Sequence, residues 1–179
     1  MRMADMVLNG ERVSIRPITA ADTENIIRWR NSPSVRMNFV YREDFTAEGH
    51  SRWLTDVIGA GKAVQFIITV NSTGQDIGSV YLRDIDPVND KAEFGIFIGE
   101  DCARGNGYGT EATRLICEYG FSVLGLHKII LRVFDYNKGA IAAYKKAGFK
   151  EEALFVDDVK IDGKYESMIF MAAFNGSER

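Results

Sequence analysis

The sequence has few of the residues that mark metal sites and disulfide-bonded folds. Its 179 residues include two cysteines, two histidines and three prolines. Cys102 and Cys117 form no metal-ligand cluster with the histidines, and as ordinary thiols they suit a reducing compartment. We therefore expect no bound metal.

Long apolar runs and blocks of one charge are also absent. No segment approaches the roughly 18 apolar residues that span a membrane, and the start, MRMADMVLNGERVS, lacks the apolar core of a signal peptide. The 22 basic and 25 acidic residues are intermixed, with a formal net charge of −3, whereas a nucleic-acid-binding protein normally has a basic patch. We expect a cytoplasmic protein with no membrane and no nucleic-acid partner.

The hydrophobic pattern predicts a single domain over residues 1–179. Hydrophobic residues make up 46% of the chain, enough for a sizeable core, and no repeat, low-complexity tract or linker interrupts them. Alternating or apolar segments predict strands, and helical spacing predicts helices. The expected strands are 12–18, 63–70, 76–85, 91–99, 128–134, 153–161 and 165–174. The expected helices are 19–31, 46–58 and 137–147, with a further helix that carries Ala112 and can end at Gly125. This order predicts an α+β fold.

A glycine-rich stretch, RGNGYGTEA, occupies residues 104–112, between an expected strand and an expected helix. It lacks the Gly-Lys-Ser/Thr ending of a Walker loop, and its GxGxG spacing differs from a dinucleotide fingerprint. It fits R-x-x-G-x-G, formed by Arg104, Gly107 and Gly109. Glycines admit a ligand close to the backbone, and the helix N-terminus adds partial positive charge, which suits a pyrophosphate. A strand-to-helix turn without a ligand is the alternative.

A second motif, NKGAIAAYKKAGF, contains Asn137, Tyr144 and Gly148-Phe149. With both motifs in this order, the chain resembles the GNAT superfamily of N-acetyltransferases over nearly its whole length. In that superfamily an R/Q-x-x-G-x-G/A loop binds the pyrophosphate of acetyl-CoA, and an N-x(6)-Y-x(3)-G-F helix follows. The resemblance implies a GNAT fold: a mixed, mostly antiparallel, twisted sheet of six to seven strands, splayed between the fourth and fifth and flanked by about four helices.

The resemblance also implies direct transfer of acetyl from acetyl-CoA to a primary amine. Tyr144 stands where the family keeps a phenol beside the sulfur, and a pKa of about 10 suits a proton donor to a basic thiolate. Glu93 is our candidate for removing the amine's proton, directly or through water, and a backbone N–H near Phe97 would stabilise the oxyanion. The expected cofactor-binding residues are Phe97, Ile98, Gly99, Arg104, Gly105, Asn106, Gly107, Tyr108, Gly109, Thr110, Asn137 and Tyr144.

Each of these residues has a plainer alternative. Tyr144 would be a core aromatic, Asn137 a helix cap, Glu93 a solvated strand charge, and Arg104 a surface charge.

The acceptor is expected from the segment WRNSPSVRMNFVYREDFTAEGHSRWL, with its WRN, V-R-x-N and H-x-x-W patterns. It resembles a subgroup that includes ribosomal-protein N-terminal acetyltransferases and spermidine acetyltransferases. It is most similar to nucleotide-sugar N-acetyltransferases of pseudaminic-acid synthesis, which acetylate the 4-amino group of a UDP-linked deoxy sugar. The expected acceptor is therefore an amine on a nucleotide-linked sugar, bound by Arg30, His50 and Trp53. Ordinary packing and helix-end roles are the alternatives for these three residues.

Other acceptors and functions stay open. Glu43, Asp44, Glu48 and Asp56 are available for an acidic polyamine pocket. A peptide N-terminus is a further candidate acceptor, and a non-catalytic acyl-CoA-binding module is the alternative to an enzyme. The apolar C-terminal segment SMIFMAAF would gain from cover, which favours a homodimer.

Overall fold

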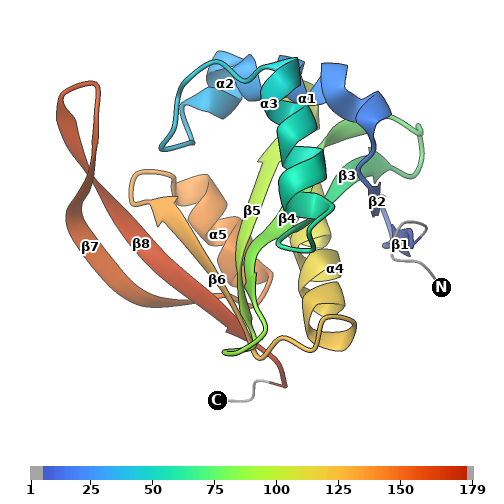
Figure 1. Cartoon of the computed structure of the whole chain (residues 1–179). Helices are drawn as coiled ribbons and strands as arrows, with labels where there is room; N and C mark the ends of the chain where they lie inside the picture. The colour runs from blue at the N-terminus through green and yellow to red at the C-terminus, as the bar shows by residue number, and fades with distance from the viewer. Residues whose placement is uncertain (1–5, 177–179) are drawn as a thin grey trace.

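The computed structural model describes residues 6–176, and its centre is one eight-stranded sheet (Figure 1). The strand order is β1-β2-β3-β4-β5-β6-β8-β7. The strands are β1 Leu8–Asn9, β2 Val13–Pro17, β3 Val64–Val70, β4 Asp76–Asp86, β5 Lys91–Ile98, β6 Lys128–Phe134, β7 Lys150–Ile161 and β8 Lys164–Phe174. Neighbouring strands are antiparallel except β5 and β6, which are parallel. The expected mixed, mostly antiparallel sheet is confirmed, and β1 is an additional short strand.

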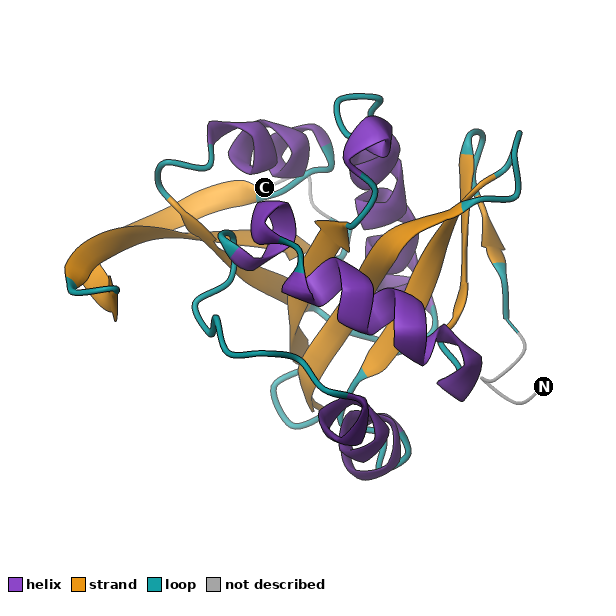
Figure 2. Cartoon of the chain, turned by 90° about the horizontal axis from the view of Figure 1, so that it is seen from above, coloured by secondary structure: helices purple, strands orange, loops and turns teal. Residues whose placement is uncertain are grey.

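The described residues form five α-helices, which lie on both faces of the sheet (Figure 2). They are α1 Thr23–Asn31, α2 Pro33–Arg36, α3 Ala47–Arg52, α4 Tyr108–Ser122 and α5 Lys138–Lys146, and α3 continues as a π-helix over Trp53–Ile58. The first predicted helix begins with a 3-10 turn, Ala20–Asp22, and ends at Asn31. Ser32 is extended because it precedes Pro33, and a residue before proline disfavours the helical conformation.

Side chains of β5 alternate between the two faces of the sheet. Ile96 and Ile98 lie next to Gly109, at the start of α4. Phe97 points the other way, because neighbouring side chains of a strand lie on opposite faces, and its ring is 6.3 Å from the ring of Trp29 in α1. The strand β5 therefore contributes side chains both to the face of the sheet that α4 covers and to the face that α1 covers.

The sheet splays between β5 and β6, as the resemblance to the GNAT superfamily implied for the fourth and fifth long strands. The two strands pair only at their beginnings, through Lys91 with Lys128, Ala92 with Ile129 and Glu93 with Ile130. Beyond Glu93, β5 stays paired with β4, and β6 stays paired with β8. Residues 94–98 consequently border an opening on the β6 side.

The β7–β8 hairpin curves away from the body of the molecule (Figure 1). Its apolar strand β8 lies between β6 and β7, so the segment SMIFMAAF is already covered within the chain. The exposed apolar side chains lie on the edge strand instead, at Leu154, Phe155 and Val156. Of the described helices, none is long and apolar enough to cross a membrane.

Candidate functional site

A cavity of about 750 Å³ lies at the splay and reaches both faces of β5. It brings together most of the residues that the sequence singled out. Those that line it are Arg30, His50, Trp53, Glu93, Phe97, Ile98, Arg104, Gly105, Gly107, Tyr108, Gly109, Thr110, Asn137 and Tyr144. The motifs and the acceptor segment therefore border one space.

Two predicted cofactor contacts are placed elsewhere. Gly99 does not line the cavity; a Cβ at this position would overlap the side chain of Trp29, so the glycine is required for packing. Asn106 does not line it either, and its Nδ2 donates to the carbonyl oxygens of Cys102 and Arg104. These two residues shape the strand end and the loop.

The glycine loop opens α4 with a turn that only glycine adopts easily. Gly105 and Gly107 have φ of 77° and 78°, in the left-handed region where a Cβ is disfavoured. The first bond within α4 joins the Glu111 N–H to the Gly107 carbonyl at 3.2 Å. The preceding N–H groups are left for a ligand at the positive end of a 15-residue helix. This arrangement fits a pyrophosphate.

Arg12 and Glu111 brace the loop from outside the cavity. Arg12 Nη1 donates to the Asn106 carbonyl at 2.8 Å, and its Nε donates to Glu111 Oε2 at 3.1 Å. Glu111 Oε1 also accepts from the backbone N–H of Arg12 at 2.8 Å. The sequence analysis did not identify the pairing of Arg12 with Glu111, because the two residues are 99 positions apart and belong to no motif.

The Arg104 guanidinium ties the loop to β5 and α2. Its Nη2 donates to the Ile98 carbonyl at 2.8 Å and to Ser34 Oγ at 3.2 Å, and Nη1 lies 3.1 Å from Asp101 Oδ1. Since the guanidinium also borders the cavity, a role toward phosphate remains a prediction.

Tyr144 lies on the α5 side of β5. Its ring meets Phe94 edge-on at 5.6 Å and lies 6.1 Å from the ring of Phe149. Burial raises the pKa of Tyr144 above its ordinary value of 10, so the phenol stays protonated at neutral pH. A protonated phenol facing the cavity can donate a proton to a leaving thiolate.

Asn137 performs two structural tasks beside the cavity. Its Oδ1 accepts from the Ala140 N–H at 3.1 Å, which caps α5, and its Nδ2 donates to Asn38 Oδ1 at 2.9 Å. The cap that the sequence allowed is present, together with a bond to the loop after α2.

Glu93 lies on the opposite face of β5 from Phe94. Its Oε1 accepts from Arg83 Nη2 at 2.9 Å and from Arg132 at 3.3 Å. Because two guanidiniums hold Oε1, Oε2 is the oxygen left for an acceptor amine or a water molecule. Glu93 is thus an anchored carboxylate rather than a solvated strand charge.

Arg30 extends from α1 over the aromatic part of the cavity. The guanidinium carbon is 3.4 Å from the Phe39 ring centre, and Phe45 and Phe97 lie around it. Its Nη1 is buried and has no hydrogen-bond partner within residues 6–176. Burial lowers the pKa of Arg30 below its ordinary value, which reflects a charge placed where little solvates it.

His50 and Trp53 complete the same side of the cavity. His50 is fully buried; its Nδ1 lies 2.9 Å from Thr23 Oγ1, and its Nε2 has no partner among the described residues. Trp53 Nε1 donates to Gln65 Oε1 at 2.7 Å, so only its ring is left for contact with a ligand. Of the polar groups on these two residues, His50 Nε2 is the one still available.

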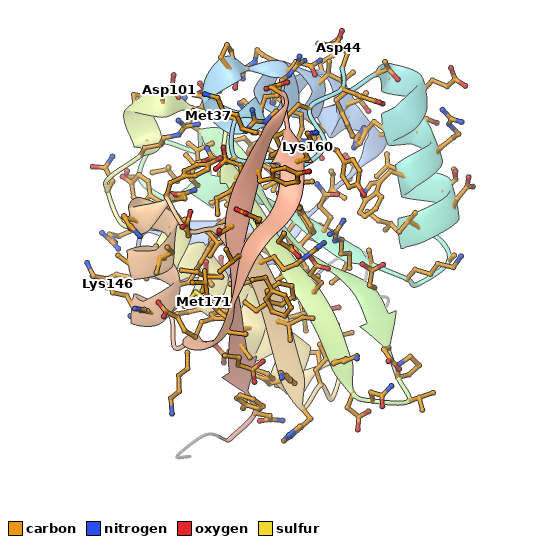
Figure 3. The ribbon with its side chains drawn as sticks, turned by 90° about the vertical axis from the view of Figure 1, so that its left-hand side faces the viewer. Met37, Asp44, Asp101, Lys146, Lys160 and Met171 are labelled. Atoms are coloured by element: carbon orange, nitrogen blue, oxygen red, sulfur yellow. The ribbon has the colours of Figure 1, made fainter. Side chains whose placement is uncertain are left out.

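The loop between α2 and α3 covers the acceptor side of the cavity. Its residues 38–41 and 45 line the space. Arg42 pairs with Asp162 at the hairpin tip at 3.3 Å, and the Tyr136 hydroxyl donates to the Met37 carbonyl. Figure 3 labels Met37 at the start of this loop and Lys160 on the β7–β8 hairpin. The loop is therefore held by residues that follow the C-terminal ends of β6 and β7.

A family model described as the acetyltransferase (GNAT) domain matches residues 12–150. The chain belongs to the GNAT acetyltransferase family. A spermidine N(1)-acetyltransferase of Escherichia coli K12 is 32% identical over 163 residues, which cover 90% of this chain and 86% of that enzyme. This GNAT chain is accordingly an acetyl-CoA-dependent N-acetyltransferase, with acetyl-CoA as the cosubstrate.

Solved structures of GNAT enzymes share the fold. The spermidine N-acetyltransferase of Vibrio cholerae, in complex with CoA and spermine, superposes with a TM-score of 0.84 at 24% identity, covering 93% of this chain and 97% of that one. A further structure of the Vibrio enzyme is dodecameric, with a TM-score of 0.77 at 24% identity, covering 92% and 95%. The expected nucleotide-sugar acceptor finds no support in these relatives.

Among the cavity residues that were not foreseen for this GNAT site, four are polar residues on strands: Gln65, Tyr81, Arg83 and Arg132. They lie on β3, β4 and β6, away from both motifs. Single residues on strands carry no motif signal, and only strand pairing brings them to Glu93 and Trp53. Within the described residues there is no group of three His, Cys, Asp or Glu side chains that could hold a metal ion.

Proposed function

We propose that this enzyme acetylates the primary amine of a small molecule by direct transfer. One observation carries the proposal. The cavity extends over both faces of β5. On one face it is lined by the N-terminus of α4 and by Tyr144, and on the other by Glu93 and by Arg30 with the aromatic rings around it. The splay beyond Glu93 is the passage between the two halves.

In the proposed reaction, Tyr144 and Glu93 transfer protons on opposite faces of β5. The amine nitrogen attacks the thioester carbonyl carbon; the C–N bond forms, the C–S bond breaks, and its electron pair goes to sulfur. Tyr144 then protonates the thiolate, and Glu93 Oε2 accepts the proton lost by nitrogen, directly or through water. A backbone N–H near Phe97 would stabilise the oxyanion.

Because similar proteins are spermidine N(1)-acetyltransferases, a polyamine is the first acceptor to test. The carboxylates that the sequence offered for it are placed less favourably. None of Glu43, Asp44, Glu48 and Asp56 lines the cavity, and Asp44 is paired with Arg36. A polyamine would have to reach acidic groups outside the cavity.

The charge inside the cavity favours a second acceptor class. Among the described residues that line it, Glu93 is the one carboxylate, and two guanidiniums already engage it. Arg30 adds an unpaired positive charge on the same side. At about 6 Å and an effective dielectric near 20, the Arg30 guanidinium alone would repel an ammonium by about 3 kcal/mol. An amine with a neutral or anionic body, such as a nucleotide-linked amino sugar, avoids this repulsion.

An acceptor panel tests both parts of the proposal. Spermidine, a UDP-linked 4-amino sugar and a Ser-first peptide are incubated with acetyl-CoA, and mass spectrometry detects one added acetyl. From the charge we expect the anionic amine to have the higher kcat/KM, and Arg30→Gln to raise its KM while CoA binding stays unchanged. Arg52→Gln is the control, because Arg52 is exposed on α3 and does not line the cavity.

The outcomes separate the alternatives. Preference for spermidine, improved further by Arg30→Gln, would refute the electrostatic argument and support the polyamine acceptor. Binding of CoA without acetylation of any amine would support a non-catalytic acyl-CoA-binding module.

Self-association through the β7 edge is part of the same proposal. Leu154, Phe155 and Val156 are exposed on an edge strand, and such edges are usually covered. Light scattering at micromolar concentration should give a multiple of the chain mass of 20.0 kDa, whereas a monomer mass would contradict it.

A further inference from the structure

The side chain of Tyr81 lies across β5 at the splay. Tyr81 pairs with Gly95 in the β4–β5 ladder. A Cβ on Gly95 would overlap ring carbon Cζ and the hydroxyl oxygen of Tyr81. The absence of a side chain at Gly95 therefore lets the phenol lie directly over the strand, two residues beyond the last β5–β6 pair at Glu93.

The surroundings of the ring hold it in this position. The Trp53 ring meets it edge-on at 6.5 Å and 74°. Trp53 is itself bonded to Gln65, whose Nε2 donates to Ser79 Oγ at 2.8 Å, and Ser79 Oγ donates to the Phe66 carbonyl at 2.8 Å. A chain of buried polar contacts from β3 and β4 thus fixes the orientation of the phenol.

The hydroxyl has no hydrogen-bond partner within residues 6–176, although it borders the cavity. A phenol hydroxyl is both a donor and an acceptor, so at the cavity wall it can pair with a polar group of a bound ligand. Burial raises the pKa of Tyr81, so the group is neutral at physiological pH. A neutral acceptor oxygen without a partner suits a ligand that carries N–H groups.

Strand alternation places this hydroxyl on the acceptor side. Gly95 shares its face with Glu93 and Phe97, whereas Phe94, which packs on Tyr144, belongs to the other face. Tyr81 and Tyr144 approach β5 from opposite sides. The two phenols are therefore suited to different reacting atoms, Tyr144 to the sulfur and Tyr81 to the nitrogen.

We propose that the Tyr81 hydroxyl oxygen accepts a hydrogen bond from the acceptor's amine and holds its nitrogen in line with the thioester carbonyl carbon. Tyr81 keeps its own proton throughout, and the proton lost by nitrogen leaves by the Glu93 route. This role rests on the proposed N-acetyl transfer, and it holds for any acceptor body because it concerns the amine alone.

The test removes one oxygen atom. Tyr81→Phe keeps the ring that packs on Trp53, and Tyr119→Phe is the matched control, since Tyr119 is a buried phenol that does not line the cavity. We measure kcat/KM for spermidine, the UDP-linked 4-amino sugar and the Ser-first peptide, together with the Kd of CoA by calorimetry. Tyr81→Phe should lower kcat/KM by about 10-fold or more for every acceptor used, with CoA affinity within about twofold. Tyr119→Phe should change neither value by more than about twofold.

A purely structural Tyr81 would give a different pattern. If Tyr81→Phe melts like the wild type and retains its kcat/KM, or if CoA affinity falls in parallel, the proposal is overturned. A loss confined to one acceptor would also overturn it, because that result would assign Tyr81 to the acceptor body. If the wild type binds CoA but acetylates no amine, the proposed function fails first and this role fails with it.

Discussion

Gly109→Ala should separate cofactor binding from folding. Gly109 is the second residue of α4, and its φ lies outside the left-handed region. An added Cβ would meet Ile98 Cγ1 at 3.8 Å and Ile96 Cδ1 at 3.9 Å, which are ordinary contacts. Alanine is favoured over glycine in a helix by up to about 1 kcal/mol, so the variant should be at least as stable as the wild type.

The neighbouring glycines do not offer this separation. Gly105 and Gly107 have positive φ, and a side chain there costs about 1–2 kcal/mol. At Gly107 a Cβ would also lie 3.0 Å from Arg12 Nη2. Loss of CoA binding in those variants would be explained equally well by a disturbed loop.

The expected loss of affinity follows from the position of the new methyl group. It lies in the cavity between the start of α4 and β5, where the N–H groups of the first turn would bind a phosphate. A hydrogen bond to a charged group contributes about 1.5–3 kcal/mol. Losing one such bond should weaken CoA binding by about 10- to 100-fold, since 1.4 kcal/mol corresponds to a factor of about 10.

Calorimetric titration with CoA and a thermal melt measure the two effects. Gly49→Ala is the control, because Gly49 lies in helix α3 and does not line the cavity. A Cβ added at Gly49 would have Thr46 Oγ1 as its nearest neighbour, at 3.3 Å. An unchanged Kd in a folded Gly109→Ala variant would show that the cofactor does not approach this turn.

Two further predictions concern titratable groups of the site. Tyr144→Phe should lower kcat by about 10²-fold or more with a smaller change in the acetyl-CoA KM, because a proton donor is lost; a fall below about threefold, with chemistry limiting, would remove Tyr144 from the mechanism. Burial lowers the pKa of His50 below 6.5, so as the pH falls below 6.5 the unfolded chain binds the proton first and the free energy of unfolding decreases. Urea titrations of the wild type between pH 8 and 5 should show this loss, and His50→Gln should have a shallower slope; equal slopes would contradict the assignment.

The sequence by itself determined the local parts of the site. The R-x-x-G-x-G motif predicts the turn that opens α4, because positive φ at Gly105 and Gly107 is a property of the local backbone. Asn137 was likewise recognisable as a cap, since its side-chain oxygen Oδ1 accepts from the N–H of Ala140, three residues along the chain. The long strands and the α+β class followed from hydrophobic periodicity for the same local reason.

Only the tertiary structure decided what surrounds the reacting atoms. Glu93 is held by arginines from β4 and β6, and Tyr81 reaches over Gly95 because the two strands pair in one register. Gly99, which the sequence analysis gave as a cofactor contact, also leaves the space that the side chain of Trp29 fills, 70 positions earlier in the chain. These contacts join residues that are distant in sequence, and a change of register by one residue would move each side chain to the other face of the sheet. No periodicity or motif within one segment encodes such pairings, so the charge and geometry of the acceptor side became visible only in the folded chain.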